Sequence, residues 1–157
     1  MTACRCVPPA QECEERARVV RLALEYEGTP YKPNQRVKGP RGGVDCFTLI
    51  VNVYEEAQLI PKQQLPYYSQ MHHLVSKREV YIEGIERYSR EISGPPEPGD
   101  LAVYKFGLCY FHAAIVIQWP TVIHAFFRRH VFQTNAETDG FLRGHPLRFF
   151  SFWEKAC

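Results

Sequence analysis

The chain has 157 residues, of which 45% are hydrophobic and 13% aromatic, and its formal net charge is +2. This composition is typical of a folded globular protein and not of a disordered or fibrous one, and the length fits a single domain over residues 1–157. The small charge argues against nucleic acid as a partner. No apolar run reaches the roughly 18 residues that a membrane span needs.

The segment from Met1 to Cys6 lacks the basic, apolar and small-residue order of a signal peptide, so we expect a product that is cytoplasmic as made. Reduced thiols, rather than a disulfide framework, are then the expectation for the six cysteines. No cofactor and no metal are expected, because the cysteines near the start lack a familiar ligand spacing. The adjacent His72 and His73 are interpreted as part of a surface loop.

Two helices are predicted from their end signals. Residues 11–27 place apolar side chains near helical spacing, and Gly28 supplies the stop. Further along, Ser76 and Glu79 have the spacing of a capping box, and apolar residues follow at helical spacing as far as Ile92. Gly94 ends this second pattern.

A third helix, between these two, is predicted to begin at Cys46. One continuous stripe at helical spacing is formed by Cys46, Leu49, Ile50, Val53, Tyr54 and Ala57. Asp45 precedes it and is a good N-cap residue. Cys46 is therefore expected in the first turn of a helix that faces the core.

After Pro98 the pattern changes to short segments rich in β-branched and aromatic residues. We predict strands at Leu101 to Phe106, Phe111 to Trp119, Val122 to Phe127, Val131 to Thr134 and Leu147 to Trp153. Because the helices come first and the strands later, the prediction is an α+β fold. Its N-terminal helices would pack on one face of a five-stranded, mainly antiparallel sheet.

The predicted position of Cys46 favours a reactive thiol. The first turn of a helix holds amide N–H groups without helical partners, at the positive end of the backbone dipole, and this stabilises a thiolate. A nearby imidazolium would lower the pKa of the thiol further. The alternative is that Cys46 is only a small, buried core residue.

Two histidines in the predicted strands are candidates for that imidazole. His112 and His124 would lie on one face if a three-residue turn over 118–120 placed Ala114 opposite His124. A regular two-residue turn would separate the rings unless a bulge corrected the register. Each ring would otherwise be a structural histidine that hydrogen-bonds within the fold.

If the helix that carries Cys46 lies across this face, the three residues form a catalytic triad. Cys46 would be the nucleophile, His112 the base that later protonates the leaving amine, and His124 the residue that orients His112. The backbone N–H of Cys46 would donate to the oxyanion, a contact that contributes roughly 3 kcal/mol in measured cases. A zinc site made by one cysteine and two histidines is the chemical alternative.

Five elements in this order resemble the NlpC-type family of papain-like cell-wall cysteine peptidases. They are Gly28-Thr29-Pro30-Tyr31, Asp45-Cys46, Pro98-Gly99-Asp100-Leu101, His112 and Val122-Ile123-His124-Ala125. The resemblance spans about Ala17 to Phe127. It implies a papain-like fold and hydrolysis of an amide bond in peptidoglycan stem peptides, typically between γ-D-glutamate and a diamino acid. It also implies that Tyr31 and Asp45 shape the substrate end of the cleft.

The chain departs from the family pattern next to the nucleophile, where Phe47-Thr48 stands in place of a serine and a glycine. The insertion before Pro98, which includes Tyr67-Tyr68, resembles small single-domain members associated with phage tails. Phage tail proteins are then candidate partners, and a virion-associated location fits. Two alternatives stay open: a tail-assembly protein that keeps the fold as a structural or binding module, and an acyl transferase that acts on a γ-glutamyl amide.

Overall fold

A computed structural model describes residues 4–154 of the chain. Residues 1–3 and 155–157, and with them part of the segment inspected for a signal peptide and Cys157, lie outside the described residues. The elements in chain order are α1 (Pro9–Leu24), β1 (Arg36–Val37), β2 (Gly43–Val44), α2 (Cys46–Glu56), α3 (His72–Val75), α4 (Val80–Ile85), β3 (Arg90–Ile92), β4 (Leu101–Phe106), β5 (Cys109–Gln118), β6 (Thr121–Ala125), β7 (Val131–Asn135) and β8 (Leu147–Ser151).

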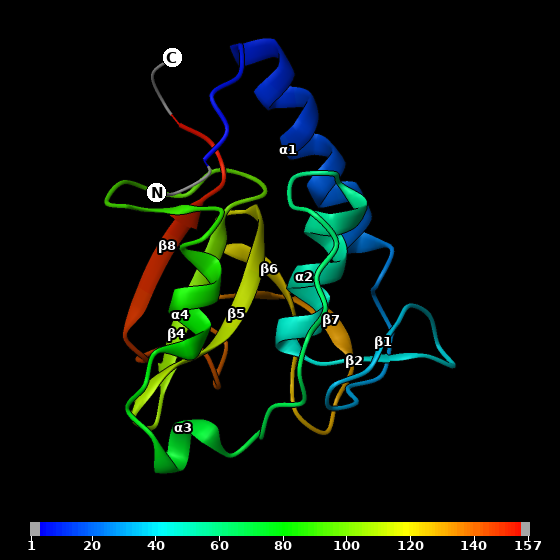
Figure 1. Ribbon diagram of the computed structural model, residues 1–157, viewed down its shortest axis with the longest axis vertical. Coiled ribbons are helices and arrows are strands. Elements are labelled where there is room, and N and C mark those ends of the chain that lie inside the picture. Colours follow the sequence, from blue (N-terminus) through cyan, green and yellow to red (C-terminus); the bar gives the residue numbers. More distant parts are fainter. Residues whose placement is uncertain (1–3, 155–157) are drawn as a thin grey trace.

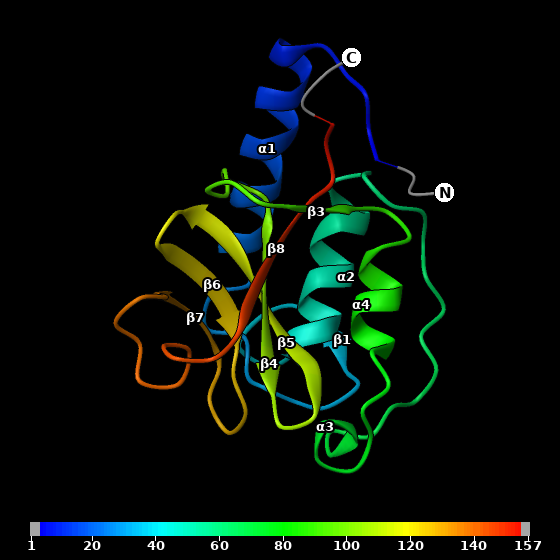
Figure 2. The ribbon, with the colours of Figure 1, turned by 90° about the vertical axis from the view of Figure 1, so that its left-hand side faces the viewer.

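The main sheet has the strand order β3-β8-β4-β5-β6-β7, and every neighbouring pair in it is antiparallel. Helices α2 and α4 lie on one face, and α1 packs against α2 and β5 (Figure 1). The view in Figure 2 looks along the sheet and separates the helical side from the side of the loop that joins β7 to β8. The predicted α+β class and the helices on one face are confirmed.

Side-chain alternation gives the sheet two apolar faces. Odd-numbered residues such as Val103, Ala113 and Ile115 face α1 and α2 in the larger core cluster. Even-numbered residues such as Tyr104 and Ala114 form a second cluster, which Ala136 and Leu142 cover from the loop between β7 and β8. Both faces of the sheet are therefore largely shielded from solvent, which agrees with strand sequences that are nearly continuous apolar runs.

The Pro98-Gly99-Asp100-Leu101 element has a structural role at the entrance to the sheet. Gly99 has a φ of +87°, which a residue with a Cβ rarely adopts. The buried Asp100 carboxylate accepts hydrogen bonds from the Glu97 amide and from the Arg16 guanidinium, both at 2.9 Å. These contacts fix the start of β4 against α1.

The predicted helix over residues 76–92 is wrong at both ends. Helix α4 covers only Val80–Ile85 and has no side-chain cap. The expected capping residue Glu79 instead accepts a hydrogen bond from the Tyr110 amide at 2.9 Å, and Ser76 bonds to the Arg78 amide two residues on. The capping-box spacing is present, but both side chains are engaged in other contacts.

Beyond α4, the chain forms a strand where the helix was expected to continue. Arg90–Ile92 is β3, and it pairs with β8. The sheet therefore has six strands and not the predicted five, because a long-range backbone pairing outweighs the local apolar spacing. The Glu91 carboxylate, paired with Arg148 at 2.7 Å, adds a cross-strand ion pair to this edge.

Two further expectations concern the cysteines and the membrane. Cys6 is disulfide-bonded, so the expectation of reduced thiols throughout is wrong at that position. Cys13, Cys46 and Cys109 are free thiols. Within residues 4–154 no helix combines the length and the apolar character that crossing a bilayer requires.

Candidate active site

Cys46 begins α2, as predicted, and Asp45 is the N-cap. The Asp45 carboxylate accepts hydrogen bonds from the amides of Phe47 and Thr48, both at 2.9 Å, and the Thr48 hydroxyl accepts from the Asp45 amide at 2.8 Å. This capping box satisfies amides that the helix leaves without partners. The cap does not use the Cys46 amide, so this N–H can donate to an oxyanion.

The thiol of Cys46 lies against strand β5. Its Sγ is 3.8 Å from the Phe111 carbonyl oxygen, and the Ala113 amide also contacts it. Burial raises the pKa of the thiol to about 12, and the charge of Asp45 acts in the same direction. Contacts with the Tyr81 hydroxyl and with the backbone oppose this rise. In this arrangement Cys46 is a protonated thiol at neutral pH.

The two histidines are hydrogen-bonded to each other. Nε2 of His112 and Nδ1 of His124 are 2.8 Å apart, and both side chains are buried. The register is the one expected from an odd-length turn: Ile115 pairs with Ile123 and Val116 with Val122. It is reached through a two-residue turn and a bulge between Val116 and Gln118, so the prediction that both rings share a face is confirmed.

The ring of His112 and the thiol of Cys46 approach β5 from different sides. His112 pairs with Tyr104, and its ring contacts Tyr104 and Phe106 on the face of the second core cluster. Cys46 packs with Ala113 on the helical face. Although the thiol contacts the two residues that flank His112, no hydrogen bond joins it to the His112 ring among the described residues.

The histidine pair is neutral in this environment. Burial and the neighbouring His124 hold the pKa of His112 well below its ordinary value. Burial also lowers the pKa of His124 to about 4, although the charge of Asp139 opposes that shift. Nε2 of His124 and the Tyr104 hydroxyl are buried without a hydrogen-bond partner among the described residues. The negative charge of Asp139 acts to raise the pKa of both His124 and Tyr104.

The two predicted substrate-binding residues are engaged by one segment, residues 61–71, which we call the strap. The strap leaves the end of α2, runs outside α4 and descends to α3 (Figure 2). The Tyr68 hydroxyl in the strap donates to Oδ2 of Asp45, and the Tyr31 hydroxyl donates to Oε1 of Gln70. Asp45 and Tyr31 are thus near the thiol but already have partners within the chain.

Phe47, which departs from the family pattern, packs into the same contact. Its ring lies 5.5 Å from that of Tyr68 and 5.1 Å from that of Tyr81, in edge-on arrangements. Asn34 holds the strap from the other side through two hydrogen bonds with the Tyr68 backbone, at 3.0 and 3.1 Å. The large side chain at position 47 therefore serves as a packing surface for the strap.

His72 lines the cavity beside Cys46, but no bond between the thiol and His72 or His73 is found among the described residues. Both rings stack on Phe111, with centroids 5.5 and 5.0 Å away, and Nε2 of His72 bonds to the Arg78 carbonyl at 2.9 Å. Within residues 4–154 no group of three histidines, cysteines or acidic residues is arranged to hold a metal ion.

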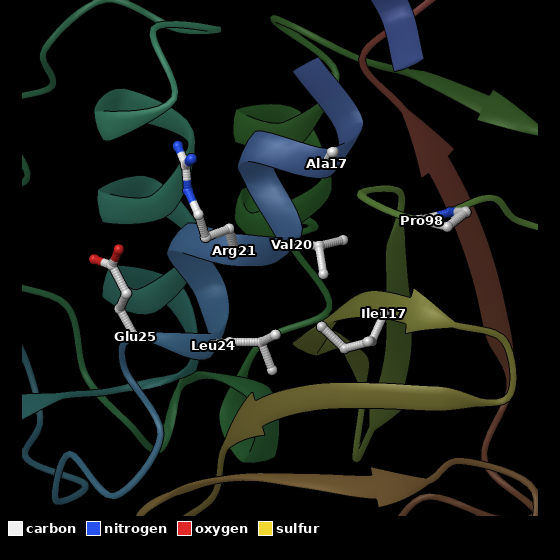
Figure 3. A pocket seen from close by; sticks show the side chains of 7 residues that line it. All are labelled: Ala17, Val20, Arg21, Leu24, Glu25, Pro98 and Ile117. Carbon is white, nitrogen blue, oxygen red and sulfur yellow. The ribbon is translucent and has the colours of Figure 1, made fainter. Parts of the chain in front are cut away.

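A hollow away from the thiol lies between α1 and the end of β5. Figure 3 shows Val20, Leu24 and Ile117 facing one another there, while the side chains of Arg21 and Glu25 point away. It brings together no candidate nucleophile or histidine, so it does not compete with the Cys46 region as the candidate active site.

Comparisons with known proteins agree on the fold. No family model and no curated protein matches the sequence. Among solved structures, the NlpC/p60 domain of the peptidoglycan hydrolase SagA is 19% identical with a TM-score of 0.53, over 85% of this chain and 96% of that chain. The peptidoglycan hydrolase RipB from Mycobacterium tuberculosis is 17% identical with a TM-score of 0.61, over 94% and 69% of the two chains.

A third similar structure is RipD from Mycobacterium tuberculosis, described as a non-catalytic NlpC/p60 domain protein adapted to peptidoglycan binding. It is 16% identical with a TM-score of 0.56, over 87% of this chain and 96% of that chain. The helices on one face of the sheet, with a cysteine at the start of α2, define a papain-like α+β domain. Within that class, the chain has the fold of NlpC/p60 domains.

Sequence reasoning missed the strap and Asp139. Tyr68 and Gln70 lie 23 and 39 residues from the partners they contact, and no local pattern marks those contacts. Asp139 follows the last residues of the family resemblance and sits in a loop. The aromatic pair Tyr67-Tyr68 within the insertion was the one signal that the sequence offered.

Proposed function

We propose that the chain is a cysteine-type amidase of the NlpC-type family that hydrolyses amide bonds in peptidoglycan stem peptides. The observation that carries the proposal is the buried His112–His124 hydrogen bond on the strand that the Cys46 thiol contacts. A structural histidine needs only one backbone partner, whereas a cysteine at a helix start beside a pair of coupled histidines fits nucleophilic catalysis. The similarity to peptidoglycan hydrolase domains supports peptidoglycan as the substrate.

In the proposed reaction, Nδ1 of His112 accepts the thiol proton, because Nε2 is engaged by His124. The Cys46 sulfur bonds to the carbonyl carbon, the amide C–N bond breaks, and the leaving amine takes the proton from His112. Water then attacks the thioester, which releases the acid and restores the thiol. His124 orients the ring of His112, and the Cys46 amide donates to the oxyanion.

The arrangement described above corresponds to a resting state in this proposal. The thiol is protonated, and the strap covers Asp45 and Tyr31. Catalytic hydrogen bonds are often long or poorly aligned in a protein without substrate and tighten in its complex. Here the proposed proton transfer also requires the His112 ring to move from the face of the second core cluster toward the thiol. Release of Tyr68 and Gln70 would free the Tyr31 hydroxyl and remove one of the hydrogen bonds to Asp45, whose carboxylate would still cap α2. The bond between γ-D-glutamate and a diamino acid is the first to test, because the sequence resemblance implies it.

The test is digestion of purified muropeptides by the wild type, Cys46→Ala and His112→Gln, with the products examined by mass spectrometry. The proposal expects cleavage by the wild type and none by the two variants. Cleavage that persists in Cys46→Ala would eliminate the mechanism. Transfer to an added amine would appear as a product of different mass and would identify the acyl transferase alternative.

A second candidate function is peptidoglycan binding without hydrolysis. It is favoured by the raised pKa of the buried Cys46 and by the lack of a described hydrogen bond between that thiol and His112. RipD, which has a similar fold and is described as non-catalytic and adapted to peptidoglycan binding, is a precedent for this candidate function. Sedimentation of the protein with purified sacculi, in the absence of any cleavage product, would support this candidate. Cleavage dependent on Cys46 would reject it.

A further inference from the structure

A large cavity opens beside the candidate nucleophile. It has a volume of about 480 Å³ and lies between α2, the strap and α4. This size is in the range of small-molecule pockets. Its wall includes Cys46 itself and a set of large apolar and aromatic side chains, among them Ile50, Tyr54, Tyr81, Phe111 and Phe152. A group bonded to the sulfur of Cys46 would therefore have enclosed, apolar space within reach.

The buried polar atoms of this wall are largely used by the fold, and the charged side chains that line it, Arg78, Glu83 and Arg87, are exposed to solvent. The Tyr54 hydroxyl donates to the Gly99 carbonyl, and the Tyr81 hydroxyl donates to the Cys46 carbonyl at 3.2 Å. Nε2 of Gln70 is a buried donor of the wall without a partner among the described residues. A polar occupant of the buried part would lose hydration and find few partners, which is costly. The chemistry of the wall fits a hydrocarbon or aromatic group.

The position of His112 determines whether the acyl group or the leaving group of the substrate occupies this cavity. A leaving group must lie beside the imidazole that protonates it. Phe111 lines the cavity, whereas the ring of His112 points to the other face of β5 and is not part of the wall. Because the proposed mechanism brings His112 to the thiol from outside this wall, the leaving group would lie outside the cavity, and the acyl group would occupy it.

We propose that this cavity is the acyl-side pocket of Cys46 and that it takes an apolar acyl group. The inference rests on the proposed roles of Cys46 and His112, and it does not depend on peptidoglycan as the substrate. It assigns to the site a substrate class, carbonyl compounds with an aliphatic or aromatic acyl side, that the fold similarity does not specify.

The test uses p-nitrophenyl esters from acetate to decanoate. In each reaction a C–S bond forms at the carbonyl, the C–O bond to p-nitrophenolate breaks, and the thiol proton passes to His112. The rate of p-nitrophenolate release and the mass of the Cys46 adduct are measured, with Cys46→Ala as the blank. We expect the acylation rate to rise up to about fourfold for each added methylene until the cavity is filled.

Gly84 provides a variant that fills the cavity. It lines the wall, and a Cβ added there would meet no atom within 4 Å. We expect Gly84→Leu to reduce the ratio of the decanoate rate to the acetate rate at least tenfold. Gly94→Leu is the matched control, because Gly94 also has free space and lies outside the cavity wall. A ratio that Gly84→Leu leaves unchanged would overturn the inference.

A binding measurement separates this inference from the proposed function. Octanamide and butanamide are titrated calorimetrically into Cys46→Ala, which has no nucleophile. Tighter binding of octanamide, weakened by adding Gly84→Leu to that variant, would support the pocket even if no muropeptide is cleaved. Equal or undetectable binding of both amides, or acylation of Cys46 that does not depend on chain length, would overturn the pocket and leave the nucleophile assignment standing.

Discussion

The two halves of the candidate site are held in different ways. The histidine pair sits within the sheet, where β4, β5 and β6 fix His112 and His124 and aromatic rings surround them. The thiol half depends on the strap, a segment without regular secondary structure whose polar contacts reach Asp45 and Tyr31. The proposed base is therefore fixed by the sheet, while access to the candidate nucleophile depends on contacts that are easier to break.

The largest expected effect is on the sheet side. His112→Gln removes the proposed base, so hydrolysis of the cleaved muropeptide should fall by about 10²–10⁴-fold. The rate is measured by chromatography of the products. His130→Gln, at an exposed histidine, is the control and should leave the rate unchanged. A His112→Gln protein that is folded by circular dichroism and fully active would assign the ring a structural role only.

The same buried pair should make stability depend on pH. The pKa of His112 and His124 lies below the ordinary value of 6.5, so the unfolded chain binds more protons than the folded one as the pH falls below that value. The stabilisation from neutral His124 is complete above pH 6.5 and is lost toward pH 4, with a size on the order of 3 kcal/mol.

Urea unfolding between pH 7 and pH 4 measures this dependence. The loss of unfolding free energy over that interval should be smaller in His124→Gln than in the wild type, while His130→Gln should follow the wild type. Equal slopes in all three proteins would mean that the buried histidines are not the source of the acid sensitivity.

A smaller effect is expected on the strap side. Tyr68→Phe removes the hydroxyl that donates to Asp45 but keeps the ring against Phe47. Loss of a hydrogen bond to a charged group should loosen the strap, so that iodoacetamide alkylates Cys46 about tenfold faster. Peptide mass mapping gives the rate at each thiol. Tyr67→Phe is the matched control, since Tyr67 is 84% exposed. Identical Cys46 rates in the two variants would show that the strap does not limit access.

The parts predicted well from the sequence are those in which local pattern and fold agree. The apolar stripe and the cap residue Asp45 located the start of α2, and the β-rich segment Leu101–Phe106 matches β4. Parity along two adjacent strands predicted His112 and His124 on one face for an odd-length turn, and a two-residue turn with a bulge produces the same register. In each case a short-range signal, capping or alternation, determines the local structure.

The parts that escaped prediction depend on contacts between distant residues. Glu79 has the spacing of a capping residue but bonds to the Tyr110 amide, and Arg90–Ile92 pairs with β8 instead of extending a helix. The strap contacts of Asp45 and Tyr31 likewise join segments without a shared pattern. Register and capping rules do not reveal which side of β5 the thiol approaches, because that depends on how α2 packs on the sheet.

The most direct test of the account is a double-mutant cycle of Cys46→Ala and His112→Gln in muropeptide hydrolysis. Residues that act as one catalytic unit are strongly non-additive, so each single variant should lose nearly as much activity as the double variant. The predicted result is a double-variant rate within about threefold of the slower single variant. Rate losses that multiply, or cleavage that survives without the Cys46 sulfur, would contradict the proposed partnership of thiol and imidazole.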